Sequence, residues 1–155
     1  MFFKFTGNFE APLPYEIVYD KVGKRLFTAR REENAITEDL FFVISPNVRF
    51  RLSFNVRDGR LTGLEYSVEL DKLPQGDIEM PCSADGCVVA DSGGCQAVCG
   101  CFYAAFKSPK AVYDAKRNIV FFGDADGDAV TFRVLKNMCV SLGINKDLRG
   151  IYILL

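Results

Sequence analysis

Apolar and polar residues alternate with a period of two along most of this chain, which is the pattern of half-buried β-strands. The clearest stretch is residues 48–56, where every second position is Val, Phe or Leu and the others are Arg, Ser or Asn. Residues 64–70 alternate in the same way after Asp58-Gly59. That pair predicts a two-residue hairpin turn, because Gly adopts positive φ without steric cost.

The register of this hairpin predicts a bulge. A two-residue turn carried onward would mix the two faces of the strands. One extra residue at Gly63 restores the pattern, since it sets Phe54 opposite Leu64 and Leu52 opposite Tyr66. A glycine inside a strand pattern often marks such a bulge.

The two ends of the chain carry the same order of motifs. Tyr19-Asp20 opens the first stretch and Tyr113-Asp114 opens the second, and Gly150 occupies the place in the second stretch that Gly63 occupies in the first. We therefore expect a bulge at both glycines. A repeated unit too small to bury its own apolar face suggests two halves that complete one core.

These patterns predict an all-β single domain over residues 1–155, an antiparallel sandwich or a partly open barrel built from two pseudo-repeats. The pseudo-repeats are residues 1–72 and 98–155, and an irregular, acidic, Cys-containing connector joins them at 73–97. The other expected strands are residues 16–20, 24–29, 40–44, 111–114, 119–122 and 129–135.

Residues 95–106 fit either a strand or a helical stripe. The strand is favoured because the matching segment of the first half, residues 2–6, has a strand pattern. Gly100 also weakens a helix by about 1 kcal/mol relative to Ala.

Composition is consistent with a thick core, because 49% of the residues are hydrophobic and the chain has 14 Phe and 6 Tyr. The 19 basic and 20 acidic residues give a net charge of −1, which predicts no nucleic-acid footprint. We expect a cytoplasmic protein with no membrane contact, since neither a signal-like start nor an apolar run of about 20 residues is present.

Five of the six cysteines fall within or just after the connector: Cys82, Cys87, Cys95, Cys99 and Cys101. They are the candidate ligands if a metal site exists, because four thiolates can close a zinc site. However, the chain has no His and no Cys-x-x-Cys pair. Disulfides would require export. Reduced, unligated thiols are favoured, and no metal or cofactor is expected.

The strand pattern also predicts on which face of its sheet a cysteine side chain lies. Cys99 and Cys101, two apart on a strand, should share one face. Cys139 should lie on the opposite face from Met138 and Val140.

A basic stripe runs along the clearest strand pattern and its turn: Arg49, Arg51, Arg57 and Arg60. It could meet phosphates, but the expected register places Arg49 opposite Glu69 and Arg51 beside Glu65, so the charges should pair across the hairpin. Nucleic-acid binding is therefore not expected.

The acidic stretch from Asp124 to Asp128 resembles the start of a calcium loop. Its twelfth position is Leu135 rather than the bidentate Glu of an EF-hand, and its flanks are strand-like. A hairpin turn is the favoured interpretation.

Enzyme chemistry has little support, because a chain without His lacks the commonest general base and has no phosphate-cradling loop. The leading hypothesis is a non-enzymatic interaction or assembly module, binding a protein partner or a second copy through edge strands or the connector. The alternatives are a carrier of a small apolar ligand in an aromatic-lined β cavity and a Cys-based metal or redox sensor.

Overall fold

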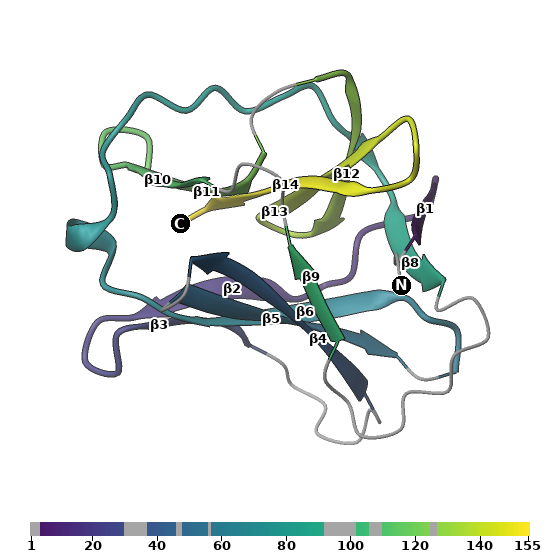
Figure 1. The fold of residues 1–155 in the computed structure, drawn as a ribbon, viewed down its shortest axis with the longest axis horizontal. Helices are drawn as coiled ribbons and strands as arrows, with labels where there is room; N and C mark the ends of the chain where they lie inside the picture. The colour runs from purple at the N-terminus through teal and green to yellow at the C-terminus, as the bar shows by residue number, and fades with distance from the viewer. Residues whose placement is uncertain are drawn as a thin grey trace.

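The structure is a computed structural model that describes residues 4–29, 37–45, 48–55, 57–91, 102–105, 110–124 and 127–155. In these segments the chain forms β-strands and one short 3-10 helix, η1 (Leu70–Lys72). Two large sheets form two layers (Figure 1). The prediction of an all-β fold is confirmed for the described residues, and none of their sheets closes into a barrel.

The N-terminal sheet has six strands. In spatial order they are β2 (Glu16–Asp20), β3 (Arg25–Ala29), β6 (Leu61–Ser67), β5 (Val48–Asn55), β4 (Thr37–Ser45) and β9 (Phe102–Ala105). All neighbours are antiparallel except β9, which pairs parallel with β4. Residues 102–105 are therefore a strand, as predicted.

The C-terminal sheet also has six strands. In spatial order they are β10 (Lys110–Asp114), β11 (Ile119–Gly123), β14 (Leu148–Leu154), β13 (Met138–Gly143), β12 (Ala129–Leu135) and β7 (Ala84–Asp85). The edge strand β7 is parallel to β12. Both sheets thus follow one plan. The opening hairpin (β2–β3 or β10–β11) comes first, then the closing hairpin (β5–β6 or β13–β14), then one middle strand (β4 or β12), and last a parallel edge strand (β9 or β7). A third, two-stranded sheet pairs β1 (Lys4–Asn8) with β8 (Cys87–Asp91).

The two large sheets pack face to face through one apolar core, to which strands of both contribute. Its centre is aromatic. The ring of Phe122 lies 5.6 Å from that of Phe50 and 4.8 Å from that of Tyr66, measured between ring centroids. All three side chains are at most 2% exposed. Phe122 comes from the C-terminal sheet and the other two from the N-terminal sheet, so the layers meet through these rings.

The opening hairpins of the two halves have matching turns. The carboxylates of Asp20 and Asp114 each accept two backbone N–H groups from the turn that follows, at 3.0–3.1 Å. Each turn ends on a residue with left-handed backbone, Lys24 (φ 51°) and Asn118 (φ 54°). For this reason β3 begins at Arg25, one residue later than expected.

The closing hairpins carry the predicted irregularities. In the first, Ser53 pairs with Gly63 while Phe54 pairs with Leu61, so Thr62 is the extra residue. In the second, the register shifts by one residue beside Gly150, and Arg149 is the extra residue.

The predicted partners in the first closing hairpin were wrong by two residues. Leu52 lies opposite Leu64, and Tyr66 lies opposite Phe50. The cause is a longer turn: Asn55 N–H donates to the Arg60 carbonyl (2.8 Å), and the Gly59 N–H donates to the Asn55 carbonyl (2.8 Å). Since the slip is even, the same side chains still face the core.

The acidic stretch from Asp124 to Asp128 is not a hairpin turn, which corrects the favoured interpretation. It connects β11 to β12, and the β13–β14 hairpin lies between these two strands in the sheet. The period-two pattern finds the strands on both sides but cannot show that a later hairpin is inserted between them. Residues 125 and 126 lie outside the described residues.

Candidate functional site on the outer face of the C-terminal sheet

The first part of the connector, residues 73–86, forms a strap across the outer face of the C-terminal sheet (Figure 1). At one edge, the Tyr113 N–H donates to the Pro74 carbonyl (2.9 Å), and the Gly76 N–H donates to the Tyr113 carbonyl (3.2 Å). At the other edge, β7 pairs with β12, and the Gly86 N–H donates to the Arg133 carbonyl (3.1 Å). We call residues 73–86 the strap.

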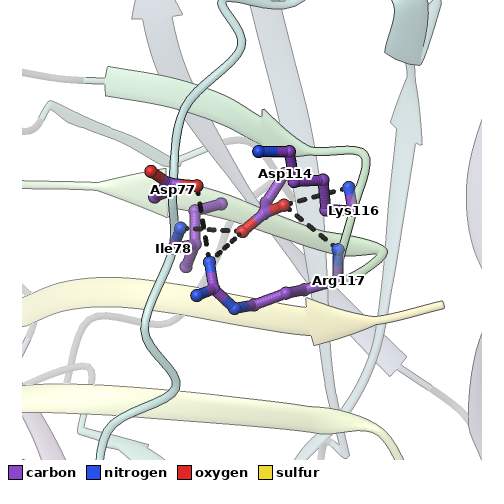
Figure 2. Close-up of polar contacts among 5 residues, drawn as sticks. All are labelled: Asp77, Ile78, Asp114, Lys116 and Arg117. Atoms are coloured by element: carbon purple, nitrogen blue, oxygen red, sulfur yellow. Dashed lines mark hydrogen bonds and ion pairs between the residues drawn. The ribbon is translucent and has the colours of Figure 1, made fainter.

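One buried carboxylate anchors the strap (Figure 2). Asp114, 2% exposed, accepts the Ile78 N–H at 3.0 Å and an Arg117 guanidinium N–H at 2.8 Å, in addition to its two turn contacts. Arg117 also lies 3.5 Å from the carboxylate of Asp77 in the strap. The Ile78 hydrogen bond, followed by that of Arg117, holds the pKa of Asp114 well below its usual range. The strap is therefore tied to the first turn of the C-terminal half.

Beneath the strap lies a small apolar cluster on the outer face of the sheet. Ile78 of the strap is buried against Ile119 and Phe121 of β11, each at most 7% exposed. Met80, Val112 and Tyr152 pack around them. Both faces of β11 are therefore buried, one in the main core and one under the strap.

Cys139 lies under the same strap. Met138 and Val140 belong to the main core while Cys139 does not, so the thiol is on the opposite face, as predicted. It is only 4% exposed, because Ser83 covers it with its hydroxyl oxygen 3.7 Å from Sγ. Burial raises the pKa of this thiol, so it is a protonated packing group at neutral pH.

A hollow of about 160 Å³ lies on this face beside the apolar cluster, half open to solvent. Small residues in register form its floor: Gly150 pairs with Ser141, and Ser141 pairs with Thr131. A side chain at Gly150 would meet the Phe121 ring 2.6 Å from its Cβ. The full lining is Pro81, Asp124, Gly127, Ala129, Thr131, Ser141, Arg149, Gly150 and Tyr152.

The hollow brings several polar groups together. The hydroxyl oxygens of Thr131 and Ser141 are 2.6 Å apart, and each residue is 5% exposed. Arg149, the extra residue of the bulge, has its Nε 2.8 Å from an Asp147 carboxylate oxygen. Its carbonyl accepts the Asp124 N–H at 2.8 Å, which places Asp124 at the rim. The hollow therefore brings hydrogen-bond donors and acceptors together at one place on this face.

The predicted cysteine candidates do not form a group in the described part of the chain. Cys82 is exposed and Cys87 is buried, and both are free thiols. Burial, with a smaller contribution from the charge of Glu10, raises the pKa of Cys87. No cluster of three or more potential metal ligands occurs among the described residues. Cys95, Cys99 and Cys101 lie outside them.

The basic stripe pairs with acidic groups where it is described. Arg51 and Glu65 form an ion pair at 2.6 Å, and Arg60 lies 3.0 Å from a carboxylate oxygen of Glu10. The predicted pairing of Arg49 with Glu69 is wrong. The hairpin is shifted by two residues from the expected register, so that Arg51 lies directly opposite Glu65. The side chain of Arg49 lies outside the described residues.

The sequence analysis did not predict the hollow, although one sequence pattern indicates that this face of the sheet is covered. In residues 138–142 apolar and small residues occupy every position, which is typical of a strand covered on both faces. Thr131 and Ser141 are buried polar residues of β12 and β13, and they form part of the floor of the hollow.

No family model and no curated protein matches this chain, so the interpretation depends on the geometry alone. Within the described segments there is no helix with the length and hydrophobicity that a membrane crossing requires.

Proposed function

We propose that this protein is a non-enzymatic assembly module that pairs with a second copy of itself through the outer face of the N-terminal sheet. The observation that carries the proposal is the difference between two matching rows of residues. On the C-terminal sheet the row from Val112 through Phe121 and Tyr152 is covered by the strap. On the N-terminal sheet the corresponding row has a composition suited to an interface, and its described side chains, Val18, Phe27, Arg51 and Glu65, remain partly exposed.

That second row crosses the sheet in register. Val18 pairs with Phe27, Phe27 with Glu65, and Glu65 with Arg51. The pairing continues along the backbone to Phe41 and then Tyr103. The side chains of Arg51 and Glu65 are 37% and 42% exposed, and those of Val18 and Phe27 are half-buried. Aromatic residues and Arg are the types enriched in protein interfaces.

The charges on this face balance, which favours a second copy over a strongly charged partner. Arg25 lies over the Phe27 ring at 4.7 Å and within 3.8 Å of Asp20, and Arg51 is paired with Glu65. A two-fold interface must be complementary to itself, and alternating Arg and acidic residues can exchange partners across such an axis. Six strands about 4.8 Å apart span about 25 Å, the width that an interface of roughly 800 Å² per partner needs.

The shared strand order also supports an origin of residues 1–72 and 98–155 by duplication within one domain. The same plan of hairpins and the bulges at Gly63 and Gly150 recur in both halves. The parallel edge strands come from elsewhere in the chain, β9 from the second half and β7 from the connector. After a duplication, the connector covered one outer face, and we propose that the second face is covered by a copy of the protein.

The assembly hypothesis is favoured over the apolar-ligand carrier because aromatic rings fill the space between the layers. Phe50, Tyr66 and Phe122 occupy the centre where a carrier would hold its ligand. Cys82 and Cys87 do not support the alternative of a Cys-based metal or redox sensor. Among the described residues, neither belongs to a group of three or more side chains that could bind a metal ion.

Native mass spectrometry with light scattering over a range of concentrations tests the proposal. We expect a dimer for the wild type and a monomer for Phe27→Glu, because a second copy of the protein would have to bury the introduced carboxylate, and burying a charge is costly. Val22→Glu is the matched control, since Val22 is 94% exposed in the β2–β3 turn, and it should remain dimeric. A wild-type protein that is monomeric at about 100 µM, well above the Kd of a standard interface, would refute self-association.

A further inference from the structure

We propose that the hollow on the outer face of the C-terminal sheet binds a single neutral sugar ring. This site lies on the layer opposite the proposed dimer face, and it depends on different residues. Its success or failure is therefore independent of self-association.

The floor of the hollow has a hydrogen-bond donor left over. Thr131 and Ser141 carry two hydroxyl protons between them. One proton lies in the 2.6 Å hydrogen bond that joins the two oxygens. Among the described residues no acceptor takes the second proton, although each residue is 95% buried. A buried donor of this kind requires an acceptor, and the hollow is the space that these hydroxyls line.

The rim offers both kinds of hydrogen-bonding group. The guanidinium of Arg149 carries only N–H donors and the carboxylate of Asp124 only acceptors, and both residues line the hollow. Together with the floor hydroxyls, four polar side chains surround a small volume. A ring bearing several neighbouring hydroxyls satisfies such a set, because each hydroxyl both donates and accepts.

Charge excludes a simple anion. Among the described lining residues Arg149 carries the single guanidinium, which lies 2.8 Å from the carboxylate of Asp147, and Asp124 adds a second carboxylate at the rim. The surroundings are therefore net negative, which disfavours phosphate or a free carboxylate. A neutral ligand with many hydroxyls avoids this repulsion.

The walls and the size of the hollow also fit one sugar ring. Tyr152 and Pro81 also line the hollow, and their side chains offer apolar surface that can pack on the C–H face of a ring. A volume of about 160 Å³ is well below the roughly 300–1,000 Å³ of pockets that hold drug-sized ligands. This is room for one ring rather than for a chain of them.

Titration of the isotopically labelled full-length protein with single sugars, followed by two-dimensional NMR, tests the proposal. The probes are glucose, galactose, mannose, xylose and N-acetylglucosamine, with sodium acetate and phosphate as the anion arm. We expect saturable shifts from at least one sugar, with Kd in the millimolar range. The shifted amides should belong to Gly127, Thr131, Ser141 and Gly150, and neither anion should compete.

Two variants locate the binding. Ala129→Phe fills the hollow from its rim without touching the hydroxyls and should weaken binding at least tenfold. Val130→Phe is its matched control, because Val130 is the next residue on β12, is 59% exposed and does not line the hollow; its affinity should be unchanged. Thr131→Val removes one hydroxyl at constant shape and should also weaken binding. Absence of saturable shifts for every sugar, tighter binding of acetate or phosphate, or full binding by Ala129→Phe would each overturn the proposal.

Discussion

At the scale of single residues, Asp114 performs two tasks, of which its counterpart Asp20 performs only one. Both carboxylates accept the N–H groups of their own turn, but Asp114 also accepts Ile78 N–H of the strap and pairs with Arg117. Asp20 lies at the surface, with 35% of its side chain exposed, and has no strap to hold. Comparing substitutions at Asp20 and Asp114 therefore separates the loss of stability caused by breaking a turn from the loss caused by breaking the strap anchor.

We expect Asp114→Asn to lower the urea midpoint at pH 7 clearly more than Asp20→Asn. The pKa of Asp114 is lowered in the folded protein, so its charge stabilises the fold above the unfolded value of about 4, and this contribution is lost as pH falls through the folded pKa. The difference between wild type and Asp114→Asn should therefore shrink between about pH 5 and pH 2. Urea unfolding across this range measures it, and a constant difference would contradict the assigned role.

At the scale of elements, the alternation of residues located strands well and their partners less well. Strand β12 has the predicted bounds, and β2 matches as well, because local pattern alone defines both. The partners of β5 were wrong because the turn closes at Asn55 and Arg60 rather than around a two-residue loop. Turn length depends on hydrogen bonds that no periodic pattern encodes.

A second element-scale feature is the side chain of Asn137, which links the two layers. Its Oδ1 accepts the Ile17 N–H of β2 (2.8 Å), and its Nδ2 donates to the carbonyls of Ile17 (2.8 Å) and Leu154 (2.7 Å). Part of the outer edge of β2 is thus capped by an amide from the turn between β12 and β13. A capped edge offers fewer free groups for strand pairing.

We expect Asn137→Ala to cost about 2 kcal/mol of unfolding free energy, because three hydrogen bonds of about 0.5–1.5 kcal/mol each are lost and partly replaced by water. The Ile17 amide should also exchange faster with deuterium. Asn137→Asp keeps the acceptor for the Ile17 N–H but donates to neither carbonyl, so its exchange at Ile17 should be intermediate. Equal exchange in all three proteins would show that the amide is not the cap.

At the scale of the whole molecule, the layers depend on the aromatic centre. Phe122→Ala should cost about 3–5 kcal/mol, as expected for a large buried ring replaced by a cavity, since Phe122 is fully buried and contacts rings of the other sheet. Phe9→Ala is the control, because Phe9 is 79% exposed, and its effect should stay within about 0.5 kcal/mol. Chemical unfolding of both variants gives the comparison.

The sequence could not indicate that the connector lies across one sheet. Its Pro, Gly and acidic residues are typical of a loop, and the residues that hold it, Tyr113 and Asp114, come about 40 positions later. The hollow follows from the same long-range arrangement, because Thr131, Ser141 and Pro81 meet only after the strap has crossed. The aromatic content did indicate a thick core, since burial of rings is independent of which strands carry them.

The position of β9 has a consequence for synthesis of the chain. β9 pairs with β4 at the edge of the N-terminal sheet, yet about 56 residues (46 to 101) separate the two strands. At about 5–20 residues per second, a ribosome needs about 3–11 s to translate them. The same interval passes between the emergence of β4 and that of β9 from the exit tunnel. Until β9 arrives, one edge of β4 lacks this partner, and such an edge can recruit strands from neighbouring nascent chains. On a crowded polysome, the pace of translation through the connector therefore sets how long this half is exposed to aggregation.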